Sequence, residues 1–336
     1  MIVYFDKANY IKYLKTVDDD KEGPDTLRML KNQLSIHLNF KTEDLDEYEQ
    51  VLLEEFQSGV STHFKFTFGD NEIVRPIKKE NLPSKNGIYL LDDSSLSSLK
   101  KQHTVVAGGV GEEIDALKTL IIDIDYSFHA ERVIGKDITY TNHLNILGLP
   151  FSTLVVVDRY MFKGPEVGGN LGLYQYNLDL ILKNAFINKQ GYSRLIFVYQ
   201  INTKVANTSP YYDEGPDLEK LTTKIKKVTH KYCPAPELYF IGVPSGIIDD
   251  EHDRFIISNY LRIKSGDSLI YFDSSGVVTT KSKTVDFYSL GNKNYRDVNT
   301  IILNKLSQII EETLDKHPKY SKVPHGTQSK EVINFN

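Results

Sequence analysis

The chain is poor in the residues that build covalent or metal-based scaffolds. Its 336 residues include one cysteine, Cys233, three methionines and no tryptophan. A single thiol excludes an internal disulfide framework and a cysteine cluster for zinc, and it favours a reducing compartment. Stability must therefore come from ordinary core packing, and a hydrophobic content of 40% over this length is sufficient for that.

Long apolar runs are also absent. No stretch approaches the about twenty apolar residues that a membrane-spanning helix needs. The first residues lack the basic start and apolar core of a signal peptide. We therefore expect a globular protein of the cytoplasm without a transmembrane segment. The formal net charge of -5 argues against a dedicated nonspecific nucleic-acid binder, although a local basic groove is compatible with it.

The second half of the chain alternates between segments with strand and helix patterns. Strands are expected over residues 152–157, 195–200, 238–243 and 269–272, and helices over residues 178–186, 218–232 and 298–314. The β-branched run at 152–157 is typical of a strand buried on both faces. This order predicts an α/β fold in which helices pack on the faces of a central sheet.

The first half of the chain has a mixed pattern. Strands are expected over residues 1–4, 63–68, 87–91 and 104–107, and helices over residues 26–37, 42–56 and 112–121. Thr42 is the expected N-cap of the second helix. Glycines 108, 109 and 111 follow a strand as in a phosphate-binding loop, but Glu112 and Glu113 oppose an anion there. We therefore expect no cofactor.

The change of pattern near Pro150 divides the chain. We expect a mixed α+β N-terminal domain over residues 1–149, an α/β domain over 150–315 and a tail over 316–336. The tail contains prolines, a glycine and polar residues, so it is expected to pack poorly and to dock on a partner.

The most informative segment is the one that contains His252, Asp253 and Arg254. These residues lead into Phe255 and Ile257, and a hairpin follows. Residues two apart on a strand share a face, so an imidazole and a guanidinium would point together while the apolar side chains point the other way. A titratable ring beside a planar cation that binds two phosphoryl oxygens is a pattern typical of phosphate handling.

The segment resembles the phospholipase D superfamily motif, written His-x-Lys-x4-Asp, with Arg254 in place of the lysine and Asn259 in place of the aspartate. It is similar to degenerate phospholipase D-like domains that read His-Asp-Arg before a hairpin, such as the C-terminal domain of MIT-domain proteins and bacterial relatives. The resemblance implies a C-terminal phospholipase D-like sheet flanked by helices. In active members it implies a histidine that attacks phosphorus and a lysine that neutralises the phosphoryl oxygens.

The departures from that motif favour binding over turnover. Arginine does not copy a compact ammonium, and asparagine carries no charge. Asp249, Asp250, Glu251 and Asp253 surround His252 with negative charge, which favours the imidazolium and repels an anion. No second histidine lies at ligand spacing, so we expect no metal.

The expected site contains seven residues from strand ends and the hairpin. They are the motif residues His252, Arg254 and Asn259, and the supporting phosphate- or partner-binding residues Asp158, Arg159, Arg262 and Lys264. The structural alternative is a loop that enters a strand, with the histidine bonded to backbone and the arginine paired to a local carboxylate. The lysine-rich helix over 218–232 is either a solvated face or a strip that contacts a phosphate backbone.

Three functions follow as hypotheses. The first is a degenerate phospholipase D-like protein that recognises a phosphate, a nucleic acid or a protein partner in a prokaryotic multi-protein system, with antiviral defence suggested by family analogy. The second is a metal-independent phosphodiesterase or nuclease in which a homodimer brings two His252 side chains together. The third is a structural scaffold whose acidic N-terminal domain makes the contacts. Whether the protein is an enzyme stays open.

Overall fold

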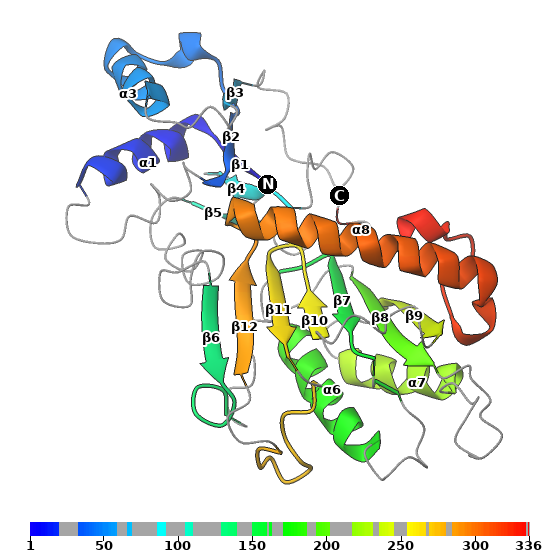
Figure 1. The fold of residues 1–336 in the computed structure, drawn as a ribbon. Coiled ribbons are helices and arrows are strands. Elements are labelled where there is room, and N and C mark those ends of the chain that lie inside the picture. The colour runs from blue at the N-terminus through cyan, green and yellow to red at the C-terminus, as the bar shows by residue number, and fades with distance from the viewer. Residues whose placement is uncertain are drawn as a thin grey trace, which may run out of the picture. The chain divides into compact units, whose positions relative to one another are not determined.

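The structure of the protein is a computed structural model. It describes residues 1–19, 33–58, 66–68, 86–91, 105–109, 129–139, 150–159, 161–162, 171–186, 193–201, 217–230, 235–244, 254–266, 269–279, 284–333 and 335. These residues form a mixed α/β fold with two sheets (Figure 1), as expected for the fold class. Two compact units contain them: Met1–Phe128 with Ser289–Asp297 and Asn336, and His129–Tyr288 with Val298–Phe335.

The sheet of the N-terminal unit has five strands in the order β3-β2-β1-β4-β5. The strands are β1 (Ile2–Phe5), β2 (Ser35–Leu38), β3 (Phe66–Phe68), β4 (Ile88–Leu90) and β5 (Val106–Gly108). All neighbouring pairs are parallel. The mixture of helices and strands expected here is therefore present, and its strands all run in one direction.

Helix α1 (Lys7–Asp19) begins one residue after β1 and packs against that strand. Asp6 follows the strand and accepts a hydrogen bond from the backbone N–H of Asn9 at 2.8 Å, which satisfies a free donor of the first turn. Tyr10 and Tyr13 are fully buried, and their rings lie 5.7 and 5.1 Å from the ring of Phe5. Aromatic packing thus attaches the helix to β1.

Two helix predictions in this unit need correction. Residues 35–37, expected to end a helix, lie in β2, because Ile36 and Leu38 alternate with less buried neighbours in register with β1. The remainder of that expected helix up to residue 32 lies outside the described residues. The next helix, α3 (Glu47–Ser58), begins after Asp46 rather than at Thr42. Asp46 and Glu49 cap it reciprocally, with side-chain-to-backbone bonds of 2.8 and 3.0 Å.

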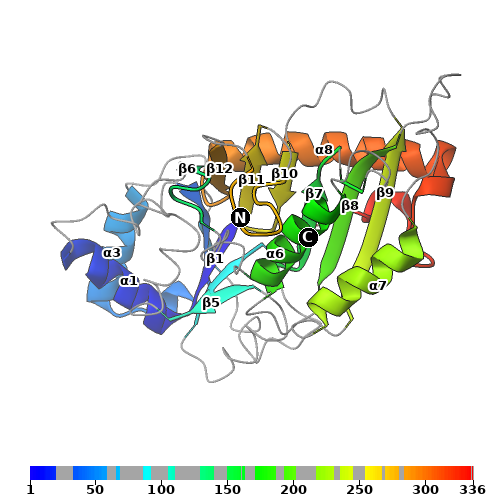
Figure 2. The same ribbon diagram turned by 90° about the horizontal axis from the view of Figure 1, so that it is seen from below.

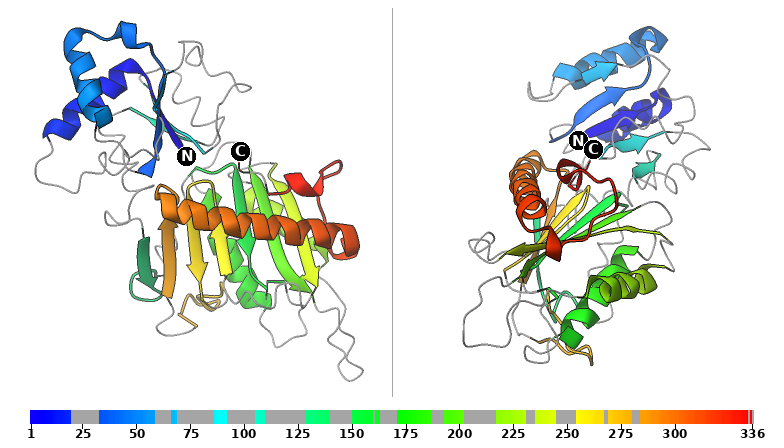
Figure 3. Two further views of the ribbon diagram at one scale, coloured as in Figure 1. Left: turned by 45° about the horizontal axis from the view of Figure 1, so that its top comes forward. Right: turned by 90° about the vertical axis from the view of Figure 1, so that its right-hand side faces the viewer.

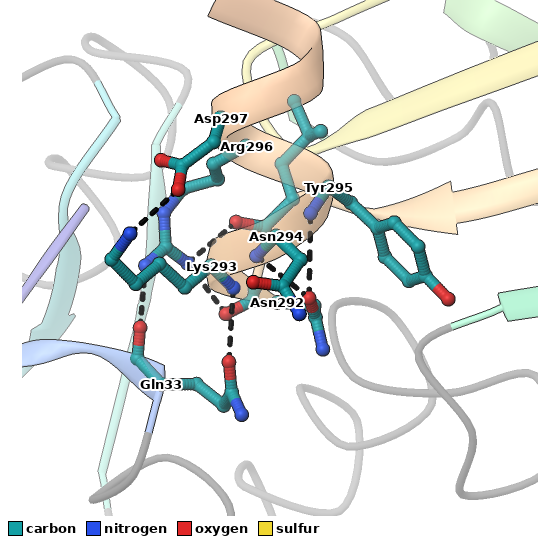
Figure 4. A network of polar contacts seen from close by, with 9 residues as sticks. Gln33, Asn292, Lys293, Asn294, Tyr295, Arg296 and Asp297 are labelled. Atoms are coloured by element: carbon teal, nitrogen blue, oxygen red, sulfur yellow. Dashed lines mark hydrogen bonds and ion pairs between the residues drawn. The ribbon is translucent and has the colours of Figure 1, made fainter.

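The start of helix α8 (Lys293–Lys316) is held by a polar network within the N-terminal unit (Figure 4). The side chain of Asn292 accepts from the backbone N–H groups of residues 294 and 295, so it acts as the N-cap. Gln33 accepts from the backbone N–H of Lys293 at 2.9 Å. Arg296 donates to the carbonyls of Leu290 and Gln33, and burial lowers its pKa to about 10, still far above neutral pH.

The sheet of the C-terminal unit has seven strands in the order β6-β12-β11-β10-β7-β8-β9. The strands are β6 (His129–Val133), β7 (Thr153–Val157), β8 (Arg194–Ile201), β9 (Glu237–Pro244), β10 (Arg254–Ile257), β11 (Leu261–Ser265) and β12 (Thr284–Ser289). Strands β7, β8 and β9 are parallel, whereas β10 is antiparallel to both β7 and β11.

Helices cover both faces of this sheet (Figure 3). α6 (Leu171–Phe186) and α7 (Leu218–Thr229) lie on one face, side by side in Figure 2. On the other face, Leu306, Ile309 and Ile310 of α8 pack against Val155, Val157, Phe255 and Ile257. The strand, helix, strand order expected for this part of the chain is confirmed, with helix and strand ends shifted by a few residues.

The strand expected over residues 269–272 does not form. Only Phe272 makes an isolated bridge, to Val278. Instead, the buried side-chain amide of Asn177 on α6 forms hydrogen bonds with the backbone of this segment. Its Oδ1 accepts from the N–H groups of Tyr271 and Phe272 at 2.8 and 3.0 Å, and its Nδ2 donates to the carbonyl of Phe272 at 2.6 Å. One side chain thus provides the hydrogen bonds that a neighbouring strand would make.

The expectation that residues 316–336 pack poorly is wrong for the described part of that segment. Lys322 exchanges two backbone hydrogen bonds of 2.8 Å with Phe240 on the outer edge of β9. The hydroxyl of Tyr199 donates to the carbonyl of Tyr320 at 2.8 Å. Val332 and Phe335 enter the core beneath α8. The segment therefore belongs to the C-terminal unit, as do residues 129–139, because β6 pairs with β12.

Candidate functional site

A buried ion pair lies at the end of the C-terminal sheet where the central strand β7 ends and its neighbour β10 begins. Phe255 of β10 lies opposite Val157 of β7, which brings the two neighbouring charged residues, Arg254 and Asp158, together. Arg254 Nε lies 3.7 Å from Asp158 Oδ1, and the two side chains are 4% and 0% exposed. The register of two antiparallel strands thus joins two of the expected site residues.

The carboxylate of Asp158 also holds the chain beyond β11. Its Oδ2 accepts a hydrogen bond from the backbone N–H of Leu269 at 2.9 Å. Nearby, burial raises the pKa of the Tyr271 hydroxyl, and the negative charge of Asp158 adds to that effect, so Tyr271 stays neutral. The pair therefore lies in an interior where one positive and one negative charge compensate each other.

Arg254 points away from the α8 core. Its neighbours in β10, Phe255 and Ile257, pack against α8, so strand alternation directs Arg254 to the face covered by α6 and α7. The structural alternative expected the arginine to pair with a local carboxylate, and the carboxylate that Arg254 meets, Asp158, follows a different strand. His252 lies outside the described residues.

Asn259 lies in the turn beyond Ile257, at the opposite end of β10 from Arg254. It is 2% exposed. Its Oδ1 accepts from the backbone N–H groups of Ser152 and Thr153 at 2.9 and 3.2 Å, and its Nδ2 donates to Ser152 Oγ at 3.0 Å. Asn259 thus fixes the start of β7, and the fold does not bring it to the Asp158–Arg254 pair.

Arg262 and Lys264 lie on the other face of the sheet from Arg254. Their partners in register are Ile257 and Phe255, which face α8. The guanidinium of Arg262 is buried and sits 4.5 Å above the ring of Tyr288. Such a contact stabilises a desolvated cation. These two supporting residues are therefore separated from Arg254 by the sheet itself.

Arg159 is the supporting residue that lies next to the ion pair. Its Nε donates to Gln200 Oε1 at 3.1 Å, and its carbonyl accepts from the backbone N–H of Gln200. The side chain is half-buried. Gln200 was not among the expected site residues, although a polar residue near the end of an otherwise apolar strand was a usable signal.

The described residues contain no group of three or more histidine, cysteine, aspartate or glutamate side chains placed to hold a metal ion. Among the described helices, none has the length and apolar character to cross a membrane. Of the expected glycine loop, Gly108 ends β5 and Gly109 follows it, whereas residues 110–121 lie outside the described residues.

The arrangement holds chain segments together more than it presents reactive groups. Asp158, Arg254 and Asn259 each make contacts inside the sheet, and Arg159 is the one expected cation beside them with partial access to solvent. No protein-family model matches the sequence, and a comparison with curated proteins finds no match either. The phospholipase D-like expectation therefore rests on the motif residues.

Proposed function

We propose that this protein is a degenerate phospholipase D-like protein that recognises nucleic-acid phosphates rather than cleaving a phosphodiester. The observation that carries the proposal is the burial of Arg254 against Asp158. The residue at the position of the phosphate-neutralising lysine has its charge compensated from within the fold. Family analogy places such a protein in a prokaryotic multi-protein system, with antiviral defence as the example.

The energetics of the ion pair support this choice. A substrate phosphate that used Arg254 would have to replace Asp158 and leave that carboxylate buried without its cation. Breaking a buried pair costs about 3–5 kcal/mol. That cost lowers affinity by roughly a hundredfold to a few thousandfold. A catalytic cycle built on Arg254 would carry this penalty at every turnover, whereas a structural role for the pair carries none.

We assign phosphate recognition to Arg159, the half-buried cation at this end of the sheet. Arg159 follows Asp158 directly, and Gln200 orients its guanidinium through a 3.1 Å hydrogen bond. A guanidinium held in one orientation loses less conformational entropy when it binds a phosphate. The ion pair beneath it fixes the end of β7 and the start of β10, and so positions Arg159.

A paired binding and cleavage assay tests the proposal. Labelled DNA and RNA are titrated with purified protein in EDTA, and the same mixtures are then examined for cleavage products. We expect binding without cleavage, and Arg159→Ala should weaken binding several-fold. Lys136→Ala is the matched control, because Lys136 lies in an exposed turn of the same unit.

Two outcomes would reject the proposal. EDTA-resistant cleavage that disappears in His252→Ala would establish the phosphodiesterase or nuclease alternative. Absence of nucleic-acid binding by the wild-type chain, combined with intact folding, would favour the scaffold alternative. In that case, co-purification with and without residues 1–128 would locate the contacts.

A further inference from the structure

Helix α7 is strongly amphipathic and is anchored in the C-terminal unit. Its N-cap, Asp217, accepts a hydrogen bond from the backbone N–H of Lys220 at 3.0 Å. Leu221, Ile225 and Thr229 are buried. Because these residues fix the inner face against the unit, the opposite face of the helix is directed to solvent.

The outer face carries a local excess of positive charge. Its exposed side chains include four lysines and a histidine: Lys220, Lys224, Lys226, Lys227 and His230. This concentration is opposite in sign to the net charge of -5 on the whole chain. Nothing in the packing of the apolar face requires it.

The nearby acids do not neutralise this face. Glu219, the one acidic residue within α7, contacts Lys322 Nζ at 2.5 Å. The carboxylate of Asp217 lies 3.3 Å from Lys220 Nζ, between two exposed side chains, where such pairs contribute little. Within the part of the chain that the structure describes, no carboxylate forms an ion pair with Lys224, Lys226 or Lys227.

Three of these lysines form a straight stripe. Lys220, Lys224 and Lys227 follow the spacing i, i+4, i+7, which places them on one line along the helix. At a rise of about 1.5 Å per residue the stripe is about 10 Å long. A stripe of this length can lie beside a phosphate backbone, and its three ammonium groups can make at most about three phosphate contacts.

We infer that the outer face of α7 binds the phosphate backbone of a nucleic acid without reading its sequence. Lysine ammonium groups are mobile point charges that neutralise phosphates and provide no base-specific geometry. A membrane surface fits less well, because interfacial helices insert apolar side chains, whereas Leu221 and Ile225 of α7 are buried within the unit and Leu218 and Val228 are half-buried. This inference rests on the proposed function for the identity of the ligand, but it concerns a different surface.

Fluorescence anisotropy with labelled duplex DNA and labelled single-stranded DNA tests the inference. The variant is Lys220→Gln/Lys224→Gln/Lys227→Gln, since glutamine keeps the helix propensity and removes the charge. The control variant is Lys15→Gln/Lys136→Gln/Lys305→Gln, which changes the net charge equally at exposed lysines elsewhere. Circular dichroism and the urea midpoint verify that both variants are folded.

The salt dependence gives a quantitative expectation. Each lost phosphate contact lowers the slope of log affinity against log salt by about 0.9 on duplex DNA and about 0.7 on a single strand. The α7 variant should therefore lose about 2.7 or about 2.1 from the slope, and at least tenfold in affinity at low salt. The control variant should keep the wild-type slope.

The remaining outcomes decide against the inference or against the proposed function. Equal losses in the two triple variants would mean that net charge alone acts. A wild-type chain that binds no nucleic acid would also overturn it. Strong competition by poly-glutamate, with the salt dependence of DNA binding unchanged in the α7 variant, would identify an acidic protein as the ligand of this face. EDTA-resistant cleavage would reject the proposed function alone. If the α7 variant binds like the wild type while Arg159→Ala binds more weakly, this inference alone is rejected.

Discussion

The Asp158–Arg254 pair makes a prediction that can be worked out from the structure. Asp158→Asn keeps the shape of the side chain and an oxygen for the N–H of Leu269, but it leaves Arg254 as an uncompensated buried cation. At 3.7 Å and an effective dielectric constant of about 20, two unit charges attract by about 4.5 kcal/mol. This agrees with the about 3–5 kcal/mol expected when one partner of a buried pair is removed.

Urea unfolding followed by circular dichroism measures this loss. With an m-value of about 2 kcal/mol per M, the midpoint of the C-terminal unit should fall by roughly 1.5–2.5 M. The control is Asp286→Asn, whose half-buried side chain lies 3.1 Å from the partly exposed ring of His129, and it should cost less than about 1 kcal/mol.

The double variant Asp158→Asn/Arg254→Met separates the pair from its surroundings. Removing both charges should recover much of the lost stability, because an apolar replacement of a buried pair is often tolerated. The reasoning is refuted if the double variant is no more stable than Asp158→Asn, or if Asp158→Asn shifts the midpoint no further than Asp286→Asn does.

Three further predictions concern other parts of the fold. Gly242→Ala should lower the free energy of unfolding of the C-terminal unit in urea by about 1–3 kcal/mol, because the new Cβ would lie 2.6 Å from the carbonyl oxygen of Tyr320. The control Gly266→Ala should leave this free energy unchanged, because its Cβ meets nothing within 4 Å. Asn259→Ala leaves buried donors unsatisfied and should cost about 1–3 kcal/mol per orphaned group, measured in the same way. Burial lowers the pKa of His37 below the value of 6.5 that it has when unfolded, so the unfolded state binds more protons in acid. Stability of the N-terminal unit should therefore fall as the pH drops below 6.5, and His37→Gln should flatten that decline in thermal melts at a series of pH values.

Local pattern was sufficient to predict the elements with a strong period. The apolar runs at residues 195–200 and 238–243 became β8 and β9, and the apolar spacing from residue 218 became α7. These segments are governed by the burial of their own side chains, and that burial is visible in the order of residues along the chain.

Local pattern failed where a side chain from a distant part of the chain decides the backbone hydrogen bonds. Residues 269–272 are apolar enough for a strand, but Asn177 on α6 takes the N–H groups that a strand would use. The segment after α8 contains prolines and polar residues, yet it pairs with Phe240 at the edge of β9. Neither partner can be identified from local composition.

The residues of the candidate site show the same difference between what the sequence predicts and what the fold decides. The sequence by itself predicted that Arg254 lies in a strand, and that Asp158 follows a strand buried on both faces. Only the tertiary structure decided that these two charges meet, that Asn259 fixes the opposite end of β10, and that Arg262 and Lys264 face the other side of the sheet. The physical reason is register. Strand pairing sets which distant residues become neighbours, and it depends on the packing of the whole sheet rather than on any one segment.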